Sequence, residues 1–134
     1  KNMNNNIAIV LGSFHKPMVE QMLSEAQVTA KECDLKIIVE RWVPGSMEKP
    51  LALKRLLMRQ DINAAVALGI IEKGETKHGL VMGNAVIHAI IQLQLEFLKP
   101  IGLGILGPEV QPSQIPSRLK PHARAAVMAV KNML

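Results

Sequence analysis

The sequence predicts an α/β protein, a three-layer sandwich in which helices cover both faces of a four-stranded parallel sheet. Four short apolar runs alternate with segments whose apolar residues recur at helical spacing. Hydrophobic residues make up 49% of the 134 residues, which is enough for a substantial core. Because no repeat or linker-like segment divides the chain, we expect residues 1–134 to form one domain, with residues 1–6 flexible.

The first half of the chain supplies two predicted strands and two predicted helices. The run IAIVLG at residues 7–12 ends in glycine and is typical of a buried strand. Pro17 suits the first turn of the next helix, where Met18, Met22, Ala26 and Ala30 recur every fourth residue. A second strand is predicted at residues 35–43, stopped by Pro44-Gly45, and a helix at residues 49–60, with Pro50 near its start.

The second half repeats this alternation. We predict a strand at residues 63–70, a helix at about 80–98, a strand at 100–106 and a loop at 107–112. A short helical piece near residues 115–120 precedes Pro121, and a last helix runs to Leu134. Strands that alternate with helices pair in parallel through right-handed crossovers, which predicts a doubly wound, flavodoxin-like fold. Ligands of such sheets bind at the loops after the strands, here residues 13–16, 43–49, 72–78 and 107–112.

Composition narrows the ligand classes. The net charge is +5 and the lysines and arginines are spread along the chain, which favours small anionic ligands over nucleic acid. The lone Cys33 excludes an internal disulfide, the N-terminus lacks an apolar signal core, and no stretch of about 18 uninterrupted apolar residues occurs. We therefore expect a cytoplasmic protein without a membrane partner, and the scattered histidines predict no metal site.

The segment GETKH, between the third strand and the third helix, carries the most chemistry. Gly74 allows a tight turn, and the amides of Glu75 and Thr76 would face outward at a helix start, which favours an anion. Thr76 could equally be a simple helix cap. His78 could accept a proton there, or could be an ordinary surface histidine.

Other candidates lie in the neighbouring loops and helices. Phe14, one of three aromatic residues, could stack on a planar ring or fill the core. Glu48 could accept hydrogen bonds from hydroxyls, and Arg118 could grip a phosphate or be a solvated surface residue. A polar stripe on the third predicted helix indicates a wet interface or channel, in which His88 is expected to be structural; its members are Asn84, His88 and Gln92.

Five segments together resemble lumazine synthase, an enzyme of riboflavin biosynthesis, and most of all its archaeal branch. They are IAIVLGSFHK, VPGSMEKPLALKRLL, AAVALGIIEKGETKHG, KPIGLGILGP and PSRLKPHARAAVMAV. The spaced motifs VPG-x-x-E-x-P and G-x-x-x-x-GET-x-H make this likeness specific, and it covers the chain from about Ile7 to its end.

The resemblance implies a role for particular positions. Phe14 stacks on the ribitylaminouracil ring, and His78 transfers protons. The rest of the substrate-binding set is Ser46, Met47 and Glu48, which hold the ribityl chain, with Ile70, Ile71 and Leu103. The phosphate-binding set is Gly74, Glu75, Thr76 and, from a neighbouring subunit, Arg118. The chain departs from the family pattern at His15, where asparagine is usual, and at Met47 and Leu103, where aromatics are common; Arg124 stands in for a shifted basic residue.

The resemblance also implies the reaction and the assembly. The family condenses 5-amino-6-(D-ribitylamino)uracil with 3,4-dihydroxy-2-butanone 4-phosphate, without metal or organic cofactor. It forms homopentamers, with the polar stripe on the central axis, and some members build a hollow shell of 60 chains. Two alternatives stay open: an archaeal-type riboflavin synthase that joins two lumazines, and a non-catalytic flavin-binding or shell-forming paralogue.

Overall fold

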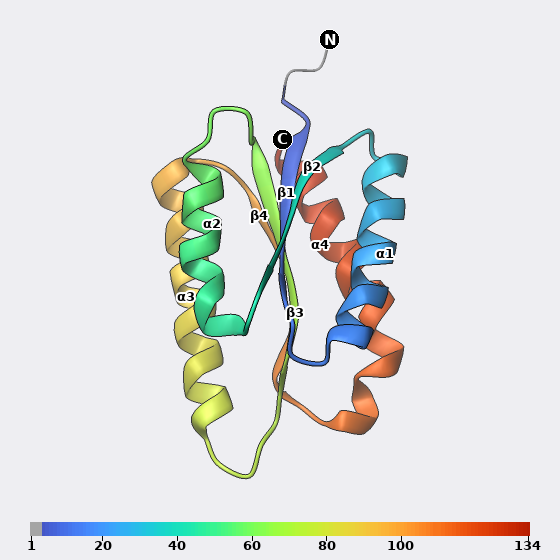
Figure 1. Cartoon of the computed structure of the whole chain (residues 1–134), viewed down its shortest axis with the longest axis vertical. Helices are drawn as coiled ribbons and strands as arrows, with labels where there is room; N and C mark the ends of the chain where they lie inside the picture. The colour runs from blue at the N-terminus through green and yellow to red at the C-terminus, as the bar shows by residue number, and fades with distance from the viewer. Residues whose placement is uncertain (1–3) are drawn as a thin grey trace.

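The computed structural model describes residues 4–134 and confirms the predicted fold class. A parallel sheet of order β2-β1-β3-β4 lies between two helical layers, with α2 and α3 on one face and α1 and α4 on the other (Figure 1). The strands are β1 (Asn6–Gly12), β2 (Lys36–Val43), β3 (Ala64–Glu72) and β4 (Ile101–Val110). The helices are α1 (Lys16–Glu32), α2 (Lys49–Leu57), α3 (His78–Phe97) and α4 (Leu119–Met133), with 3₁₀ turns at Ser46–Glu48, Pro112–Gln114 and Pro116–Arg118.

The two central strands carry the core because both of their faces are covered. β1 and β3 pair in parallel from Ile7 with Ala64 to Leu11 with Leu68, and these residues are buried. Alternate side chains point to opposite faces of a strand. Ile7, Ile9 and Leu11 therefore join the core under α1 and α4, whereas Ala8 and Val10 join the core under α2 and α3.

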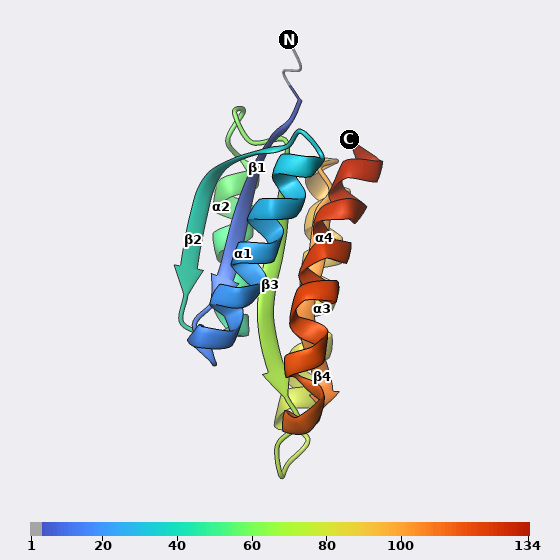
Figure 2. The same ribbon diagram turned by 90° about the vertical axis from the view of Figure 1, so that its right-hand side faces the viewer.

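The layer formed by α1 and α4 is closely packed within the chain. The two helices lie side by side over the sheet (Figure 2), and α1 buries Met22, Ala26 and Ala30 as its four-residue spacing predicts. On the sheet side, a Cβ atom at Gly102 would lie 2.1 Å from the backbone oxygen of Ala126. Only glycine therefore allows α4 to approach β4 this closely.

Three predicted boundaries were wrong. β1 begins at Asn6, which pairs with Lys36, inside the stretch expected to be flexible; residues 1–3 lie outside the described range. β4 does not stop at Leu106 but continues through Gly107-Pro108 to Val110, which pairs with Glu72 across an irregularity in the register. Pro121 does not separate two helical pieces, since α4 begins at Leu119 and holds Pro121 in its first turn, where the missing N–H costs nothing.

Candidate functional site

A pocket of about 390 Å³ opens where β1, β2 and β3 end. This is the edge of a parallel sheet at which ligands bind, and it lies at the lower end of the molecule in Figure 1. Its volume falls within the range of small-molecule sites. The residues that line it come from the end of β3, the loops after β1, β2 and β3, and the start of α3: Phe14, Pro44, Gly45, Ser46, Ile70, Ile71, Glu72, Gly74, Thr76, His78, Gly79 and Met82.

The wall after β3 combines an apolar strand end with a polar turn. Ile70 and Ile71 are buried, while Gly74 and Thr76 are exposed. The Thr76 hydroxyl accepts a hydrogen bond at 3.3 Å from the backbone N–H of His78, the first residue of α3. Thr76 is not the N-cap predicted as one of its two roles, because Lys77 occupies that position and forms no side-chain cap. His78 is exposed and lines the pocket, in a position from which its imidazole can reach a bound molecule.

The loop after β1 carries the pocket's one aromatic side chain. Phe14 is 52% exposed, so it does not fill the core, and its ring centroid lies 4.2 Å from that of His15. His15 has a left-handed backbone and ends the loop at the start of α1. Its Nε2 lies 2.7 Å from a carboxylate oxygen of Glu72, at the end of β3. This contact ties the aromatic loop to the end of the adjacent strand β3, which also lines the pocket.

The turn after β2 brings Ser46 to the pocket and a lysine beneath it. Ser46 is 8% exposed, and its Oγ accepts a hydrogen bond at 3.1 Å from Nζ of Lys49, whose side chain is fully buried. Burial lowers the pKa of Lys49 from 10.5 to about 8, because the charged form loses its hydration.

Four predicted site residues of this chain do not line the pocket. Met47 and Glu48 are exposed on the 3₁₀ turn, and Glu48 borders a separate, smaller cavity with Arg41 and Arg55. Glu75 is exposed in the loop, where its backbone and not its side chain was the predicted contact. Leu103 is exposed on β4, the edge strand next to β3.

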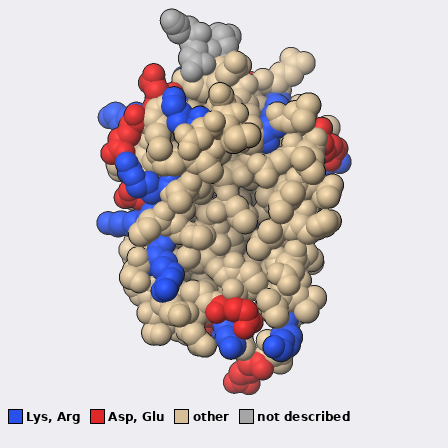
Figure 3. Space-filling model, turned by 180° about the vertical axis from the view of Figure 1, so that it is seen from behind, with Lys and Arg blue, Asp and Glu red and all other residues tan. Residues whose placement is uncertain are grey.

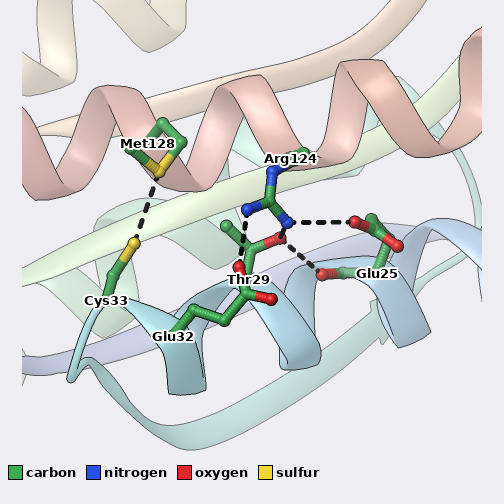
Figure 4. Close-up of polar contacts among 6 residues, drawn as sticks. All are labelled: Glu25, Thr29, Glu32, Cys33, Arg124 and Met128. Atoms are coloured by element: carbon green, nitrogen blue, oxygen red, sulfur yellow. Dashed lines mark hydrogen bonds and ion pairs between the residues drawn. The ribbon is translucent and has the colours of Figure 1, made fainter.

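The two arginines of the C-terminal segment lie on the other face of the sheet. Arg118 is exposed, does not line the pocket of its own chain, and donates from Nη1 to the backbone oxygen of Gln114 at 2.9 Å. Arg124 binds the α1 helix: its guanidinium donates to Thr29 Oγ1 at 3.2 Å, to Glu25 at 3.3 Å and to Glu32 (Figure 4). Arg124 is therefore engaged within its own chain.

Several pocket residues were missed by sequence reasoning. Glu72 is the first residue of the loop predicted after the third strand but was given no role, and Met82 belongs to a segment predicted as an ordinary helix; the folded chain shows that both line the cavity. Nothing in the sequence indicates that Lys49 is buried beneath the pocket, apart from its place three residues after Ser46, because a lysine at a helix start normally points to solvent. Within residues 4–134 no group of three His, Cys, Asp or Glu residues is arranged to hold a metal ion.

The fold and the pocket define a class: a doubly wound α/β protein that binds a small molecule at the carboxyl ends of its strands. Residues 4–134 match the model of the family described as 6,7-dimethyl-8-ribityllumazine synthase. Proteins of that name from Metallosphaera sedula and Staphylothermus marinus are 39% and 37% identical to this chain, over 95% and 96% of it and 84% and 85% of their own lengths. A third from Saccharolobus islandicus is 37% identical, over 92% of this chain and 80% of its own.

The chain belongs to the 6,7-dimethyl-8-ribityllumazine synthase family, and these relatives are archaeal. This confirms the resemblance predicted from the sequence, including its archaeal character. None of these relatives bears the name of a riboflavin synthase or of a non-catalytic paralogue.

Proposed function

We propose that this protein condenses 5-amino-6-(D-ribitylamino)uracil with 3,4-dihydroxy-2-butanone 4-phosphate to 6,7-dimethyl-8-ribityllumazine, releasing phosphate and water. Family membership supports this transferase activity in riboflavin biosynthesis. One structural observation supports the pocket as the active site most strongly. A single pocket gathers an exposed aromatic ring, a serine hydroxyl, a glycine-containing turn and an imidazole, which the chain contributes as Phe14, Ser46, Gly74 and His78.

The pocket's chemistry suits the ring substrate. Phe14 presents its ring to the cavity and can stack on a planar pyrimidine, while Ile70 and Ile71 supply an apolar wall. Ser46 is placed to bind the ribityl chain, and its neighbours Met47 and Glu48 extend that segment outward to solvent. Holding both substrates in one pocket converts a bimolecular step into a unimolecular one, which lowers the activation free energy by several kcal/mol, on the order of 7 kcal/mol in the best cases.

The turn after β3 suits the second substrate. Amides at Gly74, Glu75 and Thr76 precede the N-terminus of α3, where a helix favours a phosphate. An imine forms between the ring amine and the ketone with loss of one water, phosphate leaves, and the ring closes with loss of a second water. His78 lines the same cavity and is proposed to carry the proton transfers. None of these steps requires a metal or an organic cofactor.

The phosphate site is proposed to be completed by a second chain. Arg118 lies outside the pocket of its own chain, and its exposed guanidinium is held by one backbone oxygen. A guanidinium can bind phosphate through two parallel hydrogen bonds. We therefore propose a homopentamer in which Arg118 of one subunit enters the pocket of the next, with shells of 60 chains as a further possible state.

A broad uncharged surface supports self-association. The view from behind, toward the β4 edge of the sheet, shows a centre without charged residues, with charges only at the margins (Figure 3). In α3 the only Asp, Glu, Lys or Arg is Glu96, and its large exposed apolar residues are Val81, Ile91 and Leu95, followed by Leu98. Exposed apolar surface of this extent marks an interaction site.

The apolar character of α3 fits an interface better than a membrane. By length and composition alone this helix could cross a membrane, but one such helix is weak support for that function. The exposed polar residues Asn84, His88 and Gln92 recur every fourth position along it, and we propose that they line the axis of the pentamer. We also propose a cytoplasmic location, in keeping with a biosynthetic enzyme that has one free cysteine.

A direct turnover assay tests the function. Mixing the two substrates with the protein should form the lumazine well above the spontaneous rate, followed by its absorbance. The archaeal-type riboflavin synthase alternative predicts riboflavin from lumazine alone. The non-catalytic paralogue predicts flavin binding with no turnover of either substrate set, and that result would refute the proposed activity.

A further inference from the structure

Lys49 is a buried cation that the proposed reaction does not use. It is the first residue of α2 and has no solvent exposure. No carboxylate in the described part of the chain forms an ion pair with it; every such pair found in residues 4–134 involves another basic residue. The N-terminal end of a helix also disfavours a positive charge. A lysine in this place lowers the stability of the fold, which suggests that another property retains it.

The backbone provides a niche for this ammonium group. A Cβ atom at Gly69 would lie 2.2 Å from Nζ of Lys49, and one at Gly12 would lie 3.1 Å from it. These glycines stand on the two central strands, β3 and β1, close to the pocket end of the sheet. Any larger residue at Gly69 would displace the lysine. The niche and its occupant therefore form one structural unit.

Among the described residues, Lys49 makes one side-chain hydrogen bond, and its partner lines the pocket. Its Nζ lies 3.1 Å from Oγ of Ser46, and Ser46 lines the cavity. An ammonium group can only donate hydrogen bonds. The Ser46 oxygen consequently accepts from Lys49, and its own O–H is left to donate to another acceptor. With a pKa of about 8, Lys49 is still mostly charged at neutral pH.

We propose that Lys49 is a positioning residue which sets the Ser46 hydroxyl as a hydrogen-bond donor toward the pocket, selecting a ligand that presents an acceptor oxygen of its polyol chain there. The inference rests on the proposed function, because it assumes that the ribityl chain binds beside Ser46. It adds a determinant of specificity that acts from beneath the pocket without touching the reacting atoms.

Titration of the fluorescent product, 6,7-dimethyl-8-ribityllumazine, into two variants tests this inference. Lys49→Met keeps an unbranched chain but removes the donor, and Ser46→Ala removes only the hydroxyl. Each should weaken product binding about tenfold, the effect of losing one well-placed hydrogen bond. The double variant should lose no more than either single variant, because both changes disable the same contact.

Two comparisons make the result specific. The ligand 6,7-dimethyllumazine, which lacks the ribityl chain, should bind the wild-type protein and Lys49→Met equally well. Lys54→Met, which removes an exposed lysine of the same helix, should leave the affinity for both ligands unchanged. In turnover, Lys49→Met should raise KM for the ribityl substrate and leave kcat close to the wild-type value.

Three results would overturn the inference. The first is that Ser46→Ala binds the ribityllumazine with the same affinity as the wild-type protein. This result tests the inference even if Lys49→Met does not fold. Another is additive losses in the double variant. The third is an equal loss of affinity for the ligand without the ribityl chain. If the wild-type protein instead binds the product but does not form it, the proposed function fails while the binding test of Lys49 still stands.

Discussion

The two faces of the sheet are built for different purposes. Under α1 and α4, helix packs against helix, a glycine lets α4 touch the sheet, and Arg124 joins α4 to three side chains of α1 (Figures 2 and 4). Under α2 and α3, the chain leaves apolar side chains of α3 exposed, opens a pocket and buries a lysine that has no ion pair within residues 4–134. The first face, Arg118 excepted, satisfies its groups within the chain, whereas the second leaves exposed groups that we propose serve ligands and neighbouring chains.

This difference separates stability from function in space. Apart from Arg118, which we propose serves the pocket of a neighbouring chain, changes on the α1 and α4 face should affect unfolding and leave the chemistry of a folded chain intact. Changes at the pocket should affect binding or turnover, and removing a poorly solvated functional group should even stabilise the fold. The following experiments test this separation, from the largest expected effect to the smallest.

Gly102→Val should produce the largest loss of stability. Its Cβ would meet the backbone oxygen of Ala126, which cannot move without shifting α4. We expect the free energy of unfolding to fall by about 3 kcal/mol, as for overpacked cores, measured by urea denaturation. Gly74→Ala is the matched control, since nothing lies near its added Cβ, and it should unfold like the wild-type protein. Equal effects of the two changes would contradict the account of this face.

His78→Ala should lower kcat about 100-fold with little change in melting temperature, because an exposed imidazole is lost from the pocket and not from the core. Steady-state assays beside thermal melts separate the two quantities. His88→Ala is the matched control, since His88 is exposed on the same helix outside the pocket, and it should retain the wild-type kcat. Unchanged turnover in His78→Ala would remove this residue from the mechanism.

Lys49→Met should stabilise the folded protein at neutral pH. A pKa lowered from 10.5 to about 8 corresponds to a cost of roughly 3 kcal/mol for burying the charged lysine in the folded protein. The variant avoids this cost but loses the hydrogen bond to Ser46, which offsets about 1 kcal/mol. The net gain is therefore about 2 kcal/mol. It is largest below pH 8 and shrinks as the pH rises toward 10.5, because there the folded wild-type lysine is neutral while the unfolded chain still binds the proton. Denaturation at several pH values measures it, and a pH-independent difference would contradict the assignment.

Arg124→Ala should have the smallest effect. Its ion pairs with Glu25 and Glu32 join α4 to α1, but they are exposed to solvent. We expect a slight drop in melting temperature that disappears at high salt, where exposed ion pairs are screened. Turnover should be unchanged, because Arg124 is held by α1 in its own chain. A large loss of activity with an intact fold would instead indicate that Arg124 contributes to the active site.

The sequence predicted the fold class well because the alternation of apolar runs and helical spacing is local information. The prediction of element boundaries failed where the boundary depends on the strand or helix packed against it. Gly107-Pro108 has the composition of a turn, yet β4 continues through it because β3 extends to Glu72 and pairs with Val110. Pro121 suggested a break, yet it fits the first turn of α4.

For the site, the sequence indicated the loops that meet at the sheet edge, and Phe14, Ser46 and His78 do share a pocket. It could not indicate Lys49, because its niche arises only when β1 and β3 place Gly12 and Gly69 beside α2. It also could not place Arg118 relative to a pocket, since within one chain the two lie apart. The niche of Lys49 is visible only in the folded chain, and the role proposed for Arg118 requires a second chain.

Subunit complementation tests the central claim most directly, namely that His78 of one chain and Arg118 of its neighbour build one active site. His78→Ala and Arg118→Ala should each be nearly inactive alone. When the two are unfolded, mixed in equal amounts and reassembled, about a quarter of the sites should carry both wild-type residues, and activity should recover to that level. If the mixed assemblies form and remain as inactive as the separate variants, the shared site does not exist.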